Sequence, residues 1–89
     1  MKIKSGFVVE KVGNKYLAVA VGERADDFNA LIRMNGTGAF LFNLMSEKDM
    51  TKEELLSAML KEYDVDTERA KADILTFLSA LKGAGLLDE

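Results

Sequence analysis

Cysteine and histidine are both absent from this chain of 89 residues. Without cysteine, the protein has no disulfide, no thiolate nucleophile and no cysteine-based metal site. Without histidine, it lacks the most common metal ligand and the most common general base. The hydroxyl groups of Thr37 and Ser57 therefore have no histidine to activate them. We expect a protein that is not an enzyme and that uses no metal and no cofactor.

Long apolar segments and an excess of positive charge are also missing. No apolar run approaches the roughly 20 residues that span a bilayer, and the first residues lack the apolar core of a signal peptide. The net charge is −3, whereas domains that bind nucleic acids are usually basic. We expect a cytoplasmic protein, folded as a single domain over residues 1–89, that binds neither membranes nor nucleic acid.

Three strands are predicted in the first part of the chain, at residues 7–12, 16–21 and 28–34, because these segments are short and largely apolar. The Gly13-Asn14 pair is typical of a tight hairpin, since glycine supplies the positive φ of a type II′ turn. In the second strand, Leu17, Val19 and Val21 form the expected core face. The order suggests an antiparallel meander whose first and third strands are edges.

A nearly all-apolar helix is predicted to follow the third strand. Asn35 is a good N-cap for it, because its side-chain oxygen accepts a backbone N–H of the first turn. Apolar side chains cover most sides of this helix, which is typical of a central element surrounded by others. Gly36 and Gly38 each cost about 1 kcal/mol in a helix relative to alanine. They indicate either a loose first turn or, as we favour, close packing of the backbone.

A second helix has a clear starting signal. Thr51 and Glu54 form a capping box, in which each residue's side chain bonds the other's backbone N–H. Met50 and Leu55 are placed to pack together as a hydrophobic staple across this helix start.

A third helix is expected at residues 67–82, with Asp66 as N-cap and Gly83 as a left-handed C-cap. We read Asp64 and Asp66 as linker and cap rather than as metal ligands, because no further acidic ligands accompany them. Three strands followed by three helices predict a small α+β domain. The residues predicted on the inner face of the third helix are Ala70, Ile74, Phe77, Leu78 and Leu81.

Four stretches of the sequence together resemble the PqqD family, which contains the coenzyme PQQ synthesis protein D and the related RiPP recognition elements. They are Asn35-Gly-Thr-Gly-Ala-Phe-Leu-Phe-Asn-Leu-Met45, the Thr51-x-x-Glu54-Leu-Leu helix, Tyr63-Asp-Val-Asp66 and Ala70-x-x-Asp73-Ile-x-x-Phe77-Leu-x-x-Leu81-x-x-x-Gly85-Leu-Leu87. The resemblance covers residues 7–87 and depends on the order and spacing of the motifs. Phe42 is a departure, because many members carry tryptophan there, but it preserves the aromatic packing.

The resemblance implies a winged-helix-like domain with an N-terminal three-stranded antiparallel sheet followed by three helices. Members bind the leader segment of a ribosomally made precursor peptide and hand it to a modifying enzyme, often a radical SAM protein. The leader adds as an extra strand beside the third strand and lies against the last helix, a mode called β-augmentation. The first predicted strand begins close to Met1, so we expect the enzyme to be a separate protein.

The resemblance and the residue pattern together predict a peptide-binding site with a strand side and a helix side. The strand residues that we predict are Leu31, Ile32, Arg33 and Met34. The helix residues that we predict are Lys71, Leu75, Leu78 and Lys82. This helix flank suits leader peptides that carry apolar and acidic side chains, although Leu75 also fits an ordinary surface leucine. The alternative wall is the opposite flank, with Arg69, Asp73 and Thr76.

A winged-helix DNA-binding or regulatory protein is the main alternative function. Recognition helices need side chains such as Arg, Asn, Gln or Lys that reach base edges. The third helix places Glu68 and Asp73 beside Arg69 and Lys71, and phosphates would repel the acidic domain. An open strand edge can also pair with its own copy, so we expect a monomer or a weak homodimer.

Overall fold

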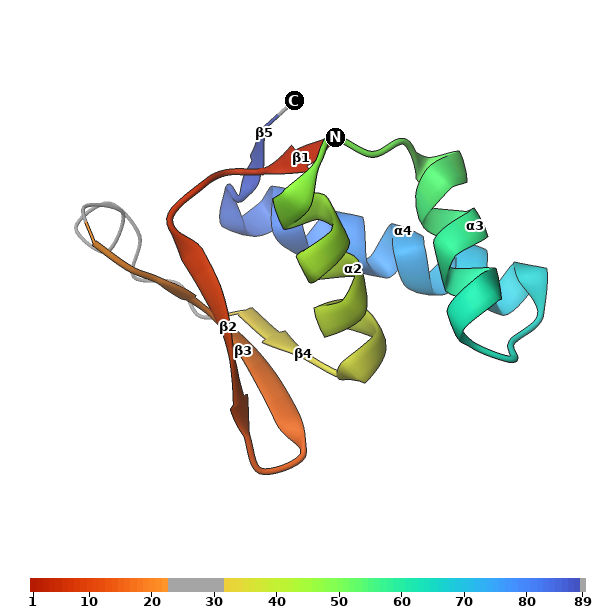
Figure 1. Cartoon of the computed structure of the whole chain (residues 1–89), viewed down its shortest axis with the longest axis horizontal. Helices are drawn as coiled ribbons and strands as arrows, with labels where there is room; N and C mark the ends of the chain where they lie inside the picture. The colour runs from red at the N-terminus through yellow and green to blue at the C-terminus, as the bar shows by residue number, and fades with distance from the viewer. Residues whose placement is uncertain (23–31, 89) are drawn as a thin grey trace.

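The computed structural model describes residues 1–22 and 32–88. Residues 28–31 of the predicted third strand, and Leu31 with them, lie outside the described residues. Figure 1 shows the sheet and its hairpin on one side of the molecule and the helices on the other. The elements in chain order are β1 (Lys2–Ile3), β2 (Phe7–Val12), β3 (Lys15–Ala20), β4 (Ile32–Met34), α2 (Gly36–Glu47), α3 (Lys52–Glu62), α4 (Thr67–Ala84) and β5 (Leu87–Asp88).

Strands β2, β3 and β4 form an antiparallel sheet in that order, which confirms the predicted meander and its two edge strands. The described chain also contains three helices after this sheet, so the predicted α+β class is confirmed. The β2–β3 hairpin closes between the paired residues Val12 and Lys15. Gly13 has a φ of 64°, whereas Asn14, like every other described residue that is not glycine, has no positive φ. This combination fits a type II′ turn, in which only the first central residue needs a positive φ.

The core face of β3 is opposite to the one predicted. Ala18 is only 1% exposed, whereas Val21 is 42% exposed and Leu17 is half-buried. The register explains this result, because Ala18 lies between Val9 of β2 and Ile32 of β4, and all three face the helices. The prediction was wrong because it followed the larger side chains, while the small Ala18 allows α2 to pack closely on the sheet.

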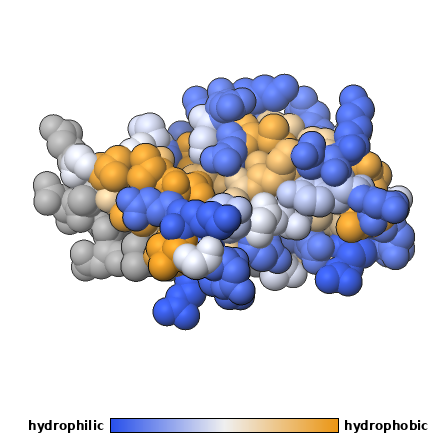
Figure 2. Space-filling model, turned by 60° about the horizontal axis from the view of Figure 1, so that its bottom comes forward, coloured by the Kyte–Doolittle hydropathy of each residue, from blue (hydrophilic) through white to orange (hydrophobic). Residues whose placement is uncertain are grey.

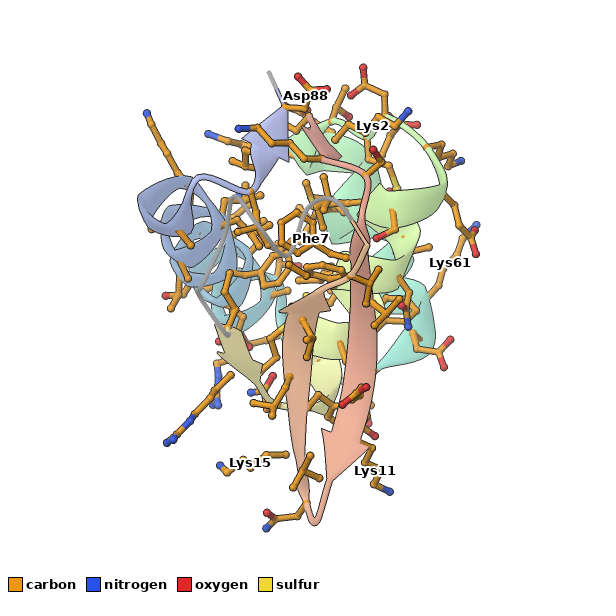
Figure 3. The ribbon with its side chains drawn as sticks, turned by 90° about the vertical axis from the view of Figure 1, so that its left-hand side faces the viewer. Lys2, Phe7, Lys11, Lys15, Lys61 and Asp88 are labelled. Carbon is orange, nitrogen blue, oxygen red and sulfur yellow. The ribbon has the colours of Figure 1, made fainter. Side chains whose placement is uncertain are left out.

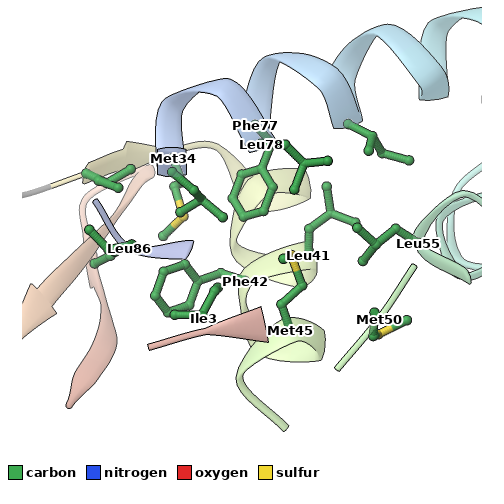
Figure 4. Packing of buried hydrophobic residues seen from close by; sticks show 14 of the residues in the cluster. Ile3, Met34, Leu41, Phe42, Met45, Met50, Leu55, Phe77, Leu78 and Leu86 are labelled. Atoms are coloured by element: carbon green, nitrogen blue, oxygen red, sulfur yellow. The ribbon is translucent and has the colours of Figure 1, made fainter. Parts of the chain in front are cut away.

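Helix α2 is the centre of the core, as its all-round apolar character predicted. Phe42 and Leu41 are each 1% exposed and Met45 is fully buried, and Figure 4 shows them between side chains from the other elements. The Asn35 side chain caps the helix, since its Oδ1 accepts the Gly38 N–H at 2.8 Å.

The two glycines at the start of α2 differ. A Cβ on Gly38 would lie 3.1 Å from the Cβ of Met34, which confirms close packing there. A Cβ on Gly36 would meet its nearest neighbour, an atom of Tyr16, only at 4.0 Å. The backbone of α2 therefore approaches β4 at Gly38, and at that position a larger residue would press the two elements apart.

Helices α3 and α4 cover the other side of α2. The predicted capping box is present, with Thr51 Oγ1 accepting the Glu54 N–H at 3.1 Å and Glu54 Oε1 accepting the Thr51 N–H at 3.0 Å. Met50 and Leu55 are both buried, as the hydrophobic staple predicted. All five residues predicted on the inner face of α4 are buried: Ala70, Ile74, Phe77, Leu78 and Leu81.

The end of α4 lies later than predicted. The helix runs through Gly83 to Ala84, and the left-handed cap is Gly85, with a φ of 77°. Leu86 donates its N–H to the Leu81 carbonyl at 2.9 Å, which is the long hydrogen bond of a Schellman motif. Leu86 and Leu81 are both buried in the same apolar cluster, and the burial of Leu86 favours a stop at Gly85 over one at Gly83.

The two ends of the described chain meet in a short second sheet. Strand β5 pairs with β1 in an antiparallel register that sets Lys2 opposite Asp88, and Figure 3 shows both side chains at the same end of the molecule. The N-terminal amino group of Met1 also forms an ion pair with the Asp49 carboxylate. The pairing of β1 with β5 was not predicted, since two-residue strands carry no periodic signal.

Candidate functional site

Strand β4 has one paired edge and one open edge. Its three residues pair with Tyr16, Leu17 and Ala18 of β3, and no described strand pairs with its other edge. Backbone N–H and C=O groups on a strand edge of this kind can pair with another chain. Three residues of strand span about 10 Å, so the edge matches a short stretch of extended peptide.

A groove, here called the β4–α4 groove, lies between this edge and helix α4. Its floor is apolar, since Met34, Leu41 and Phe77 line it and are 6%, 1% and 8% exposed. Thr76 and Ala80 are exposed and form the helix side of its rim. The other lining residues come from β4, α4 and the start of α2: Ile32, Arg33, Asn35, Thr37, Gly38 and Asp73.

Charged side chains stand at the margin of the β4–α4 groove. Asp73 forms an ion pair with Arg69 one turn earlier, with 3.6 Å between Oδ2 and Nε. Both side chains are at least 40% exposed, so this pair contributes little to stability. Arg33 is exposed and forms no ion pair with another described residue. An exposed guanidinium group can bind an acidic side chain of a ligand.

Helical periodicity determines which side of α4 faces β4. Successive residues of a helix are about 100° apart, so Asp73, Thr76, Phe77 and Ala80 fall on one face. The centre of the buried face, near Leu81, lies roughly a quarter turn away. Phe77 belongs to both faces, which explains why it is buried and also forms the groove floor.

The helix wall predicted from the sequence does not lie beside β4. Lys71 and Leu75 line a second groove between α3 and α4, and Leu78 is buried in the core. Lys82 is exposed in the last turn of α4 and lines neither groove. Leu75 is two residues after Asp73, a rotation of about 200°, so its flank faces away from the sheet. The alternative flank, which includes Asp73, lies beside β4 instead.

On the strand side, the structure places Ile32, Arg33 and Met34 together along the groove. The sequence reasoning missed Ala80 and gave Phe77 only a core role. The three- and four-residue spacing from Asp73 to Ala80 is a signal for a shared helix face, but it does not say which element that face meets. That Ile32, Arg33 and Met34 contact a peptide stays a prediction.

Neither a metal centre nor a membrane span is found in the described parts of the chain. No three described Asp or Glu side chains are grouped so that they could hold a metal ion. Asp66 is the N-cap of α4, with its Oδ1 accepting the Arg69 N–H at 2.7 Å. None of the described helices has both the length and the apolar character needed to cross a bilayer.

Comparison with known proteins gives a family and a structural neighbour. A solved structure described as "TbiB1 in Complex with the TbiA(beta) Leader Peptide" has a TM-score of 0.70 and 24% sequence identity, covering 99% of this chain and 95% of that chain. This likeness shows a shared fold. A search of the curated proteins found no match. The family described as Coenzyme PQQ synthesis protein D (PqqD) matches residues 14–87, and this chain therefore belongs to the PqqD family.

Proposed function

We propose that this chain is a non-catalytic binding module that recognises the leader segment of a ribosomally synthesised precursor peptide and presents it to a modifying enzyme. The observation that carries the proposal is the open edge of β4 beside a groove with an apolar floor. Membership of the PqqD family supports it, as does the complex of the similarly folded TbiB1 with a leader peptide. Radical SAM enzymes are the first class of modifying enzyme to test.

The mode of binding that we propose is strand addition. A leader segment that pairs with β4 satisfies the unpaired backbone groups of that edge and turns alternate side chains toward the groove floor. Residues facing Phe77 and Leu41 must be apolar, because the floor offers few polar partners. Residues on the other face of the added strand lie on the side of Arg33, so a carboxylate is favoured there.

A DNA-binding function is less well supported. Helix α4 carries Glu68 and Asp73 among its exposed or half-buried side chains, and the chain as a whole is acidic. DNA affinity depends largely on cations that neutralise phosphates. We therefore favour peptide binding over DNA binding, and we propose a cytoplasmic monomer or weak homodimer.

Substitution of Ala80 by Arg tests the site. The long side chain would fill the β4–α4 groove from its helix rim, and we expect leader affinity to fall at least about tenfold, a loss near 1.4 kcal/mol. The measurement is calorimetric titration with leader peptides encoded beside the gene for this chain. Ala72→Arg is the matched control, because Ala72 is exposed on the same helix and lines neither groove.

Equal affinities of the Ala80→Arg and Ala72→Arg variants would contradict the assignment of the groove. Strand addition is tested separately with leader peptides methylated at single backbone nitrogens. Methylation at alternate positions is expected to abolish binding, because only alternate N–H groups of an added strand point toward β4. Uniform tolerance of methylation would rule out strand addition, even if the peptide occupies the groove.

A further inference from the structure

A second groove lies on the opposite flank of α4, between α3 and α4, and is here called the α3–α4 groove. Figure 1 shows α3 beside the first turns of α4, with β4 nearer the other end of the helix. The groove has a side from each helix, since Lys52, Glu53 and Leu56 belong to α3. The residues that α4 contributes are Lys71, Ile74 and Leu75.

The floor of the α3–α4 groove is apolar and only partly covered. Ile74 is 3% exposed and Leu56 is half-buried, but Leu75 is 53% exposed. Figure 2 shows, on one face of the molecule, apolar surface between hydrophilic side chains. A single exposed leucine is ordinary. Here Leu75 continues the apolar floor formed by Ile74 and Leu56, so the groove offers a partner a connected apolar surface.

The rims of the α3–α4 groove are positively charged on an otherwise acidic protein. Lys52 and Lys71 stand on its two sides, and neither forms an ion pair with another described residue. Glu53 is the single carboxylate among its lining residues. Two ammonium groups thus face one carboxylate at this groove, whereas the chain as a whole has a net charge of −3. The groove therefore complements an apolar segment flanked by carboxylates.

We infer that the α3–α4 groove docks an amphipathic, acidic helix of the modifying enzyme. The inference rests on the proposed function, in which that enzyme must engage the chain while the leader occupies the other flank of α4. The α3 residues that line the groove lie between Lys52 and Leu56, about 6 Å along that helix, so the groove accommodates about one turn of a partner helix. A second copy of this chain fits less well, because a two-fold contact would bring the lysines of the two copies together.

Leu75→Asp and Lys71→Glu test this docking surface. The probe is the purified modifying enzyme encoded beside the gene for this chain, titrated into the folded protein by calorimetry. We expect each variant to lower enzyme affinity at least about tenfold, as for a central interface residue, with leader affinity unchanged. The leader-saturated chain is expected to bind the enzyme as tightly as the free chain.

Matched controls are Leu60→Asp and Lys61→Glu, since these exposed residues of α3 do not line the groove. Enzyme affinity that survives Leu75→Asp and Lys71→Glu, or that falls equally in the controls, would overturn the docking inference. So would wild-type protein that binds leader but not enzyme. A wild-type chain that does not bind leader peptide would instead refute the proposed function. Failure of the docking inference and failure of the proposed function are therefore distinguishable.

Discussion

Gly38 and Gly83 both lie inside helices, but only one of them is required by its surroundings. A Cβ on Gly38 would press on the Cβ of Met34, which is fixed to the backbone of β4. A Cβ on Gly83 meets no atom within 4 Å. Gly38 thus sets the distance between α2 and the open strand, whereas Gly83 only weakens α4.

Alanine at these two positions is expected to have opposite effects. Gly83→Ala should raise the free energy of unfolding by about 0.5–1 kcal/mol, because alanine restricts the unfolded chain and favours the helix. Gly38→Ala should lower it by about 1–3 kcal/mol, the usual cost of overpacking, and should weaken leader binding by displacing β4. Chemical denaturation of both variants and leader titration measure these effects, and a stabilised Gly38→Ala variant would contradict the close packing.

At the scale of elements, α3 depends on a charged cap at its start. The Glu54 carboxylate accepts a hydrogen bond from the Thr51 N–H, and this bond holds the pKa of the Glu54 carboxyl below its ordinary value. The pairing of the N-terminal ammonium with Asp49 also lowers the pKa of that carboxyl. A carboxyl whose pKa is depressed on folding stabilises the fold at neutral pH and loses that contribution as the pH falls through the folded-state pKa.

The cap of α3 should therefore weaken in acid. We expect wild-type protein to be more stable than Glu54→Gln near neutral pH, and the difference to shrink as the pH falls below the ordinary glutamate pKa and to disappear once the pH lies below the lowered folded-state pKa. The measurement is the free energy of unfolding of both proteins across this range. Because Asp49 titrates in both proteins, its contribution cancels in the comparison. A difference that is independent of pH would show that the charge of Glu54 does not act through the cap.

Helix α4 has three different roles around its circumference. One face enters the core, one lines the β4–α4 groove and one lines the α3–α4 groove. Eighteen residues of helix are about 27 Å long, so both grooves are placed on one rigid element. The separation of the two flanks is the physical reason to expect peptide and enzyme to bind at the same time.

At the scale of the whole molecule, the fold is closed by pairing its two ends. Gly85 stops α4 in the left-handed conformation, Leu86 enters the core at 1% exposure, and β5 then reaches β1. Lys4 donates its N–H to the Leu86 carbonyl at 2.9 Å, which extends the pairing. The cap at Gly85 thus holds the last residues against the first ones.

Substitution of Gly85 should loosen this closure. Gly85→Ala is expected to cost about 1–2 kcal/mol, because a Cβ is unfavourable in the left-handed region, and Gly85→Asn should cost less. Thermal unfolding would show a decrease of roughly 4–8 °C per kcal/mol for a domain of this size. Amide exchange of Lys4 should accelerate in the alanine variant. Unchanged exchange and stability would indicate that the ends are held by other contacts.

The sequence by itself determined the kinds and order of the elements, the hairpin, the caps at Asn35, Thr51 and Asp66, and the inner face of α4. These features are local, because a cap, a turn or a helical period depends on residues a few positions apart. The same local signals identified β4 as an edge strand. They were misleading at Gly83, where a glycine resembled a cap although the apolar Leu86 selected Gly85.

Only the tertiary structure decided which faces meet. The two flanks of α4 are equally helical, and nothing local to Asp73 or Leu75 states that β4 lies on one side and α3 on the other. The core face of β3 was decided in the same way, by the contact of Ala18 with the helices rather than by the size of Leu17 and Val19. Burial depends on partners distant in sequence, so the groove beside β4 followed from the packing of the whole chain.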